Sequence, residues 1–115
     1  MTKTEINLIA AIKGAVKKVF PEISNNSFEG FLLEVPKEKK FGDFSSNIAM
    51  RLSRELRKSP LDIASGIIKH IEKSDAIQDV KVEKPGFVNF YISNEAIIAT
   101  LKDIIKEEII KLWNH

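Results

Sequence analysis

The sequence has no cysteine, only two histidines and no long apolar run. Without cysteine, a disulfide scaffold, thiol catalysis and a cysteine zinc site are excluded, and a reducing compartment is favoured. His70 and His115 lie far apart in the sequence, and no cluster of carboxylates suggests a metal site. A membrane-spanning helix needs about 20 apolar residues, whereas the N-terminal run from Leu8 to Ile12 is much shorter. We therefore expect a soluble, cytoplasmic chain that binds neither a membrane nor a metal.

The composition indicates one folded domain with an uneven distribution of charge. The 115 residues are 43% hydrophobic and 30% charged, which is enough for one modest core, so we expect a single domain over residues 1–115. The net charge is only +2, yet residues 37–58 hold seven basic and three acidic side chains. Such a segment suits an anionic partner, although a solvated helix face has the same composition. The candidate phosphate contacts are Lys37, Lys39, Lys40 and Arg54.

Apolar residues spaced by three and four positions predict four helices. The first covers residues 4–20, with Thr4 as its cap and Pro21 as its end, because proline cannot continue the hydrogen-bond ladder. Ser59 followed by Pro60 is typical of a helix start. The other expected caps are Asp43 or Ser45 for the second helix and Asn94 for the last, which runs to about Trp113.

Alternating side chains predict a small sheet. Residues 31–35 form one strand, and residues 79–93 form a hairpin whose Pro85-Gly86 turn uses the glycine for a positive φ. In the loop after Pro36, we expect Phe41 and Phe44 to anchor the chain in the core. The predicted order is α-β-α-α-β-β-α. This is an α+β domain in which about four helices cover one face of an antiparallel sheet of three to four strands.

The last strand has two unequal faces. Val88, Phe90 and Ile92 are apolar and should point to the core, which leaves the other face to solvent. That face carries Phe87, Asn89 and Tyr91. An exposed aromatic ring stacks on a nucleic-acid base and an amide pairs with a base edge, so RNA binding and ordinary surface packing both remain open.

No catalytic constellation stands out. Ser45 or Ser46, His70 and a distant aspartate supply the residue types of a hydrolytic triad. His70, however, lies between apolar residues of a predicted helix, where a histidine is rarely a catalytic base. The loop KKFGDFSSN lacks the glycines and the lysine of a phosphate-binding P-loop. We therefore expect no catalysis and no cofactor on this chain. The last helix is apolar on more than one side near its end, which suits either its own core or a junction to another domain or subunit.

Four sequence blocks together resemble the N-terminal additional domain of arginyl-tRNA synthetases. The blocks are Val35-Pro36, Gly42–Asn47, Lys58–Pro60 and Gly86–Phe90. The resemblance spans roughly residues 4–105. The class I synthetase motifs His-x-Gly-His and Lys-Met-Ser-Lys are absent from the chain, which implies that arginine and ATP are handled by a separate catalytic domain.

The resemblance implies a tRNA-binding module without chemistry of its own. In that family the domain recognises the tRNA elbow, notably a D-loop nucleotide, so the expected partners are tRNA and the synthetase's catalytic domain, with no role for DNA. Phe87 then corresponds to the base-stacking position and Asn89 to the base-edge position, while Lys84 lies where the family approaches the D-loop. The alternative is a protein-interaction or oligomerisation module that docks through the C-terminal helix.

Overall fold

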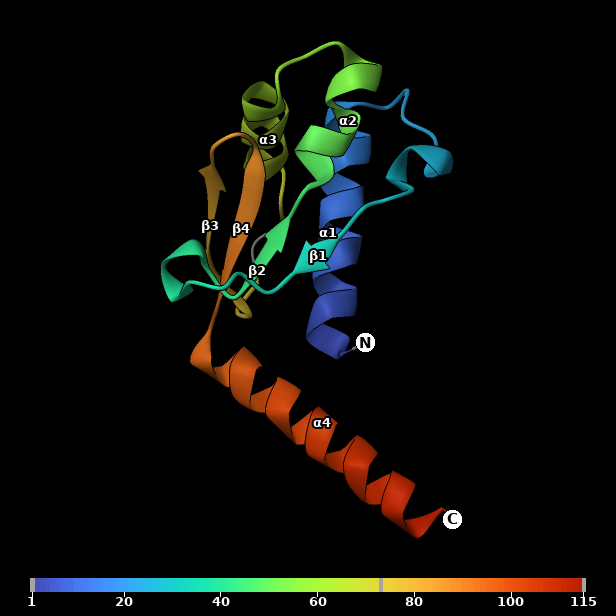
Figure 1. The fold of residues 1–115 in the computed structure, drawn as a ribbon, viewed down its shortest axis with the longest axis vertical. Coiled ribbons are helices and arrows are strands. Elements are labelled where there is room, and N and C mark those ends of the chain that lie inside the picture. Colours follow the sequence, from blue (N-terminus) through green and yellow to red (C-terminus); the bar gives the residue numbers. More distant parts are fainter. Residues whose placement is uncertain (1, 73, 115) are drawn as a thin grey trace.

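The computed structural model describes residues 2–72 and 74–114. These residues form a four-stranded antiparallel sheet in the order β1-β2-β4-β3, with helices on one side of it (Figure 1). The helices are α1 (Lys3–Val19), α2 (Ile48–Leu56), α3 (Pro60–Lys69) and α4 (Asn94–Trp113). The strands are β1 (Leu33–Glu34), β2 (Phe44–Ser46), β3 (Ile77–Glu83) and β4 (Phe87–Ile92), and two short 3₁₀ turns are η1 (Asn25–Phe28) and η2 (Lys39–Phe41). The predicted α+β class and antiparallel sheet are confirmed.

The caps of the helices follow the expected chemistry with small shifts along the chain. Ser59 caps α3 as predicted, its Oγ accepting from the N–H of Asp62 at 3.1 Å. Two cap predictions are wrong by one or two positions: Thr2 instead of Thr4 caps α1, and Ser93 instead of Asn94 caps α4. In each case the residue used still has the hydroxyl that satisfies a free N–H of the first turn.

Strand β2 is the element that the sequence analysis missed. The expected helix caps Asp43 and Ser45 are wrong, because the chain is still extended there and β2 pairs with both β1 and β4. Helix α2 begins later, where the Oγ of Ser46 accepts from the N–H of Ile48 at 3.1 Å. A strand of three residues is too short to display a readable alternation, so only its pairing partners define it.

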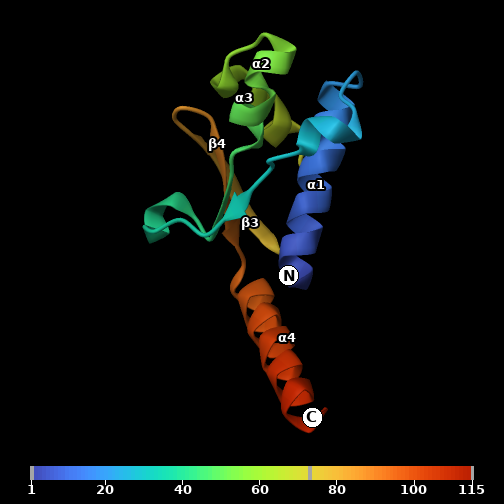
Figure 2. The same ribbon diagram turned by 45° about the vertical axis from the view of Figure 1, so that its right-hand side comes forward.

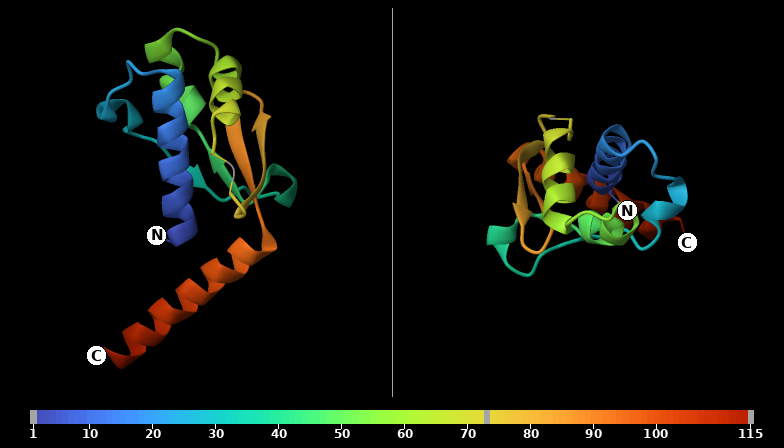
Figure 3. Two further views of the ribbon diagram at one scale, coloured as in Figure 1. Left: turned by 180° about the vertical axis from the view of Figure 1, so that it is seen from behind. Right: turned by 90° about the horizontal axis from the view of Figure 1, so that it is seen from above.

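The core lies between the inner face of the sheet and helices α1, α2 and α3. Seen from behind, α1 and α3 lie in front of the strands (Figure 3). Ile12, Leu52, Ile67 and Phe90 from four different elements are all fully buried there. The four predicted helices are present, and three of them pack over the sheet. Helix α4 has no buried residue and extends away from the other three (Figure 2).

Glycine is needed at position 86 because the backbone there lies close to Pro60, and not because the turn requires a positive φ. Its φ is not among the positive ones, so the predicted use of a positive φ is wrong. A Cβ at this position would lie 2.5 Å from the Cβ of Pro60. The β3–β4 turn therefore packs directly on the first residue of α3, and this contact fixes where Phe87 begins β4.

Candidate nucleic-acid interface

The two faces of β4 differ as its alternation predicted. Val88, Phe90 and Ile92 are buried against the helices, at 0%, 0% and 3% exposure. On the outer face, Phe87 and Tyr91 are half-buried. Asn89 is only 2% exposed, so the expectation that it faces solvent is wrong.

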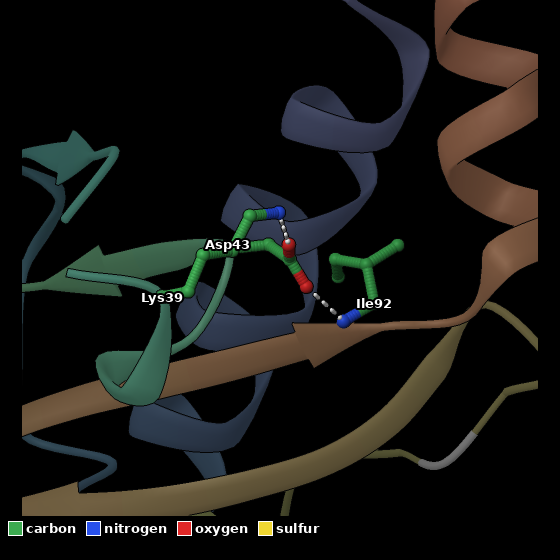
Figure 4. A network of polar contacts seen from close by, with 3 residues as sticks. All are labelled: Lys39, Asp43 and Ile92. Atoms are coloured by element: carbon green, nitrogen blue, oxygen red, sulfur yellow. Dashed lines mark hydrogen bonds and ion pairs between the residues drawn. The ribbon is translucent and has the colours of Figure 1, made fainter. Parts of the chain in front are cut away.

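The outer face is partly covered by the loop of residues 36–43, which contains η2 and lies on the side opposite the helices (Figure 2). The N–H of Asp43 donates to the carbonyl of Phe90 at 2.8 Å. The N–H of Ile92 donates to Oδ2 of Asp43, also at 2.8 Å (Figure 4). The Asp43 carboxylate thus extends the β2–β4 hydrogen bonding beyond the end of β2. At the loop's tip, the hydroxyl of Tyr91 donates to the carbonyl of Lys40.

Gly42 allows this loop to lie flat on the strand. Its φ is +97°, and a Cβ there would be 2.7 Å from the carbonyl oxygen of Phe90. Any other residue would push the loop off β4 and weaken the Asp43 contacts.

A hollow of about 320 Å³ lies between this loop and the end of the β3–β4 hairpin. It is lined by Glu34, Pro36, Phe41, Ser45, Glu83, Lys84, Phe87 and Asn89. The hydroxyl of Ser45 donates to Oδ1 of Asn89 at 2.7 Å, which orients the amide. The Nδ2 of Asn89 donates no hydrogen bond to any described residue. Among the described residues, every side-chain nitrogen or oxygen that is fully buried does have a hydrogen-bond partner. The Nδ2 atom is therefore not fully buried and can be reached from the hollow. The hollow therefore offers a free amide donor beside aromatic rings.

The charges in the hollow favour a neutral, planar ligand group over a phosphate. Lys84 is the only cation among the described residues that line it, and Glu34 and Glu83 line the same space. Two carboxylates repel a phosphate, whereas Phe41 and Phe87 supply the apolar faces on which a base stacks. A base is therefore the part of a nucleotide that this hollow suits.

Two further hollows share lining residues with the first, one after the other. The second, about 240 Å³, shares Glu34, Ser45 and Phe87 with the first and adds Leu32, Asn47 and Met50. The third shares Asn47 and Met50 with the second and reaches Arg51, Arg54 and Glu55. Arg54, on α2, is therefore at the opposite end of this series of hollows from Lys84.

The predicted phosphate contacts do not form one patch. Lys37, Lys39 and Lys40 are all exposed on the 36–43 loop, whereas Arg54 is on α2. Lys39 pairs with Asp43 at 3.5 Å and Lys40 with Glu38 at 3.5 Å. Such exposed pairs are weak, so these lysines remain accessible to an anion at the rim of the first hollow.

Three residues of the interface were not predicted. Phe41 lines the hollow, so its expected place in the core is wrong, whereas Phe44 does pack against the core. Ser45 orients Asn89. Lys81 lies opposite Asn89 in the β3–β4 register, and its Nζ is 5.1 Å from the centroid of the Tyr91 ring. Alternation along β3 could have identified Lys81, but nothing local identifies Phe41 or Ser45.

Two classes of site are not found among residues 2–72 and 74–114. No three His, Asp or Glu side chains gather there in a way that could hold a metal ion. Over the same residues, no helix is long and apolar enough to cross a membrane. His115 lies outside the described residues.

Comparison with known proteins places this chain in a family. The sequence profile described as "Arginyl tRNA synthetase N terminal domain" matches residues 7–92, from α1 to the end of β4. The chain belongs to this family. The resemblance drawn from the sequence motifs is therefore confirmed, and its Gly86–Phe90 block is the start of the strand that carries the hollow.

Similar proteins are arginine–tRNA ligases of bacteria. That of Listeria monocytogenes serotype 4a is 39% identical over 109 residues, which cover 94% of this chain and 19% of that protein. That of Thermotoga maritima is 34% identical over 88% of this chain and 18% of its own length. That of Moorella thermoacetica is 32% identical over 98% of this chain and 21% of its own length. This chain therefore spans about a fifth of the length of these relatives.

Solved structures share the fold. Arginyl-tRNA synthetase from Plasmodium falciparum matches 89% of this chain with 18% of its own, at a TM-score of 0.70 and 22% identity. Arginyl-tRNA synthetase from Thermus thermophilus matches 86% of this chain with 15% of its own, at a TM-score of 0.65 and 22% identity.

Proposed function

We propose that this chain is the tRNA-binding module of a class I arginyl-tRNA synthetase and takes one unstacked base of the tRNA D-loop into the outer-face hollow. The observation that carries the proposal is the free Nδ2 donor of Asn89 beside Phe41 and Phe87. Phe87 stacks on the base, Asn89 pairs with its edge, and Lys84 approaches the adjoining backbone. The module contributes affinity and orientation during translation in the cytoplasm, while arginine attachment with ATP belongs to the catalytic domain.

The expected energies are those of one base held by stacking and by one amide. Stacking of a base on an aromatic side chain is worth about 1–3 kcal/mol, and a good base-edge contact discriminates by a similar ~1–3 kcal/mol. With few phosphate contacts, the isolated chain should bind RNA with a dissociation constant of ~10⁻⁴–10⁻⁶ M. The lysines at the rim add the salt-dependent part of this affinity.

The test is a fluorescence-anisotropy titration of the chain with an arginine tRNA transcript. A second transcript, in which a closed stem replaces the D-loop, serves as the RNA control. Binding should weaken about tenfold or more without the D-loop, by the stacking energy above. Equal affinity for the two transcripts would contradict the proposal.

A protein-interaction function through α4 is favoured by a separate observation. Eight large apolar side chains of α4 are at least 41% exposed, which no other element approaches. Because α4 and the outer-face hollow use different residues, the two functions are compatible.

A further inference from the structure

The guanidinium of Arg51, in α2, is held in one position by the backbone of the segment that precedes β1. Its Nε and Nη2 both donate to the carbonyl oxygen of Glu29, at 3.2 and 2.7 Å. It also lies against Gly30, where a Cβ would be 2.7 Å from its central carbon atom, so any other residue at position 30 would displace it. A group fixed in this way has little conformational freedom left to lose when it binds a ligand.

Arg51 and Arg54 place two positive charges on the same side of α2. Residues three apart are neighbours on a helix surface, and like charges at that spacing repel each other. Neither arginine forms an ion pair with any described residue. Arg51 also has three of its five N–H donors left after its contact with Glu29. The pair is therefore suited to an anion that neutralises both charges.

Both arginines line the third hollow, which has a volume of about 590 Å³. The described residues that line it with them are Asn47, Met50 and Glu55. Glu55 forms no ion pair with either arginine and accepts instead from the hydroxyl of Ser27, at 2.9 Å. None of these five lining residues is aromatic, so they offer no ring on which a base stacks. Two guanidinium groups instead match a phosphate, which they bind through paired N–H donors.

The third hollow has the opposite charge balance to the first. The described lining of the first holds one cation and two carboxylates, whereas that of the third holds two cations and one carboxylate. The second hollow connects them, since it shares Phe87 with the first and Met50 with the third. A nucleic-acid strand likewise presents flat bases and anionic phosphates one after the other.

We propose that Arg51 and Arg54 bind a backbone phosphate of the RNA strand whose base occupies the outer-face hollow. This inference rests on the proposed function, because it places both sites on one strand. It also groups Arg54 with Arg51 on α2, whereas the sequence grouped Arg54 with the lysines of the 36–43 loop. The base contact selects the nucleotide, and the phosphate contact fixes the direction in which the strand crosses the protein.

The test compares Arg54→Gln with Lys69→Gln. Each substitution removes one exposed positive charge that forms no ion pair with a described residue. Lys69 is in α3 and lines none of the three hollows, so Lys69→Gln is the control for net charge. Anisotropy titrations at increasing salt use the two transcripts named above, one with the D-loop and one with a closed stem in its place. Thermal melting checks that each variant is folded.

With the D-loop transcript, Arg54→Gln should weaken binding about tenfold at low salt, as expected for a lost hydrogen bond between charged groups. It should also reduce the slope of log affinity against log salt by about one, whereas Lys69→Gln should leave the slope unchanged. With the closed-stem transcript, Arg54→Gln should leave the slope unchanged, because the contacted phosphate belongs to the loop that was replaced. An unchanged slope with the D-loop transcript would overturn the proposal, and so would an equal reduction with both transcripts. Failure of the proposed function is seen separately, as equal affinity of the unsubstituted chain for the two transcripts.

A second variant, Arg51→Lys, tests the part assigned to the guanidinium. Lysine keeps the charge but has no planar fork, so the salt slope should stay the same. The affinity for the D-loop transcript should fall about fivefold, the loss of one hydrogen bond, while the affinity for the closed-stem transcript should not change. Unchanged affinity for both transcripts would mean that Arg51 only tethers Glu29, and would overturn the role proposed for it.

Discussion

The inner and outer faces of β4 are both covered, but by different interactions. On the inner face, helices cover Val88 and Phe90 through apolar contact alone, and both are 0% exposed. On the outer face, a short loop is held on the end of β4 by directed hydrogen bonds that Asp43 and Tyr91 make. Apolar burial is the larger and less directional contribution, so the inner face supplies stability. The polar cover is more easily rearranged and leaves an amide donor free, so the outer face is available for recognition.

The largest expected effect is on the inner face. Replacing Phe90 with alanine should lower the free energy of unfolding by about 3–5 kcal/mol, because it leaves a cavity in a fully buried site. Phe87→Ala, on the same strand but half-buried, should cost much less. Urea unfolding of the two variants measures the difference. If Phe87→Ala proved the more destabilising, the assignment of the two faces would be reversed.

The next largest effect on stability is expected where the β3–β4 hairpin packs on α3. Gly86→Ala introduces a Cβ that would lie 2.5 Å from Pro60, and such overpacking should cost about 1–3 kcal/mol. The matched control is Gly14→Ala in α1, where a Cβ meets nothing within 4 Å. That variant should stabilise the protein by about 0.5–1 kcal/mol through helix propensity. Thermal melting of both tests the contact, and a neutral Gly86→Ala would show that the turn is not held by Pro60.

On the outer face, Phe87→Ala should act on binding more than on folding. Loss of about 1–3 kcal/mol of stacking corresponds to a roughly tenfold to hundredfold weaker affinity for the arginine tRNA transcript. Leu61→Ala, which truncates a 36% exposed residue on α3, should leave the affinity unchanged. Anisotropy titrations of the two variants decide whether the effect belongs to the hollow.

A smaller effect on RNA binding should distinguish the structural role of Asn89, its hydrogen bond to Ser45, from its proposed role as a donor to the base. Asn89→Ala and Ser45→Ala remove the same 2.7 Å hydrogen bond, so each should lower the free energy of unfolding by about 0.5–1.5 kcal/mol. Only Asn89→Ala also removes the Nδ2 donor, so it should weaken RNA binding further than Ser45→Ala does. Equal binding by the two variants would mean that Asn89 has a structural role only.

The smallest effect is expected at the rim of the hollow. Lys37→Ala combined with Lys39→Ala should weaken binding about equally for different tRNAs and reduce the slope of log affinity against log salt by roughly one to two. The measurement is a titration series at increasing salt with two different tRNA transcripts. An unchanged slope would remove these lysines from the interface.

Local sequence patterns predicted most of the secondary structure, for reasons that involve only neighbouring residues. Helix periodicity, the Ser59-Pro60 start and the alternation along β4 depend on backbone geometry that repeats every two to four residues. The motif block Gly86–Phe90 likewise identified the family and the strand of the candidate site. The predicted helices, the strand β4 and the family are confirmed.

The remaining features depended on contacts between distant parts of the chain. Strand β2 exists because β1 and β4 pair with it, and Asn89 is buried on the outer face beside Ser45 of β2, which lies more than forty residues earlier in the chain. The apolar pattern of α4 predicted a helix correctly, but a pattern cannot say whether the partner of that face lies in the same fold. Periodicity shows which side chains share a face, whereas tertiary packing alone decides what covers that face.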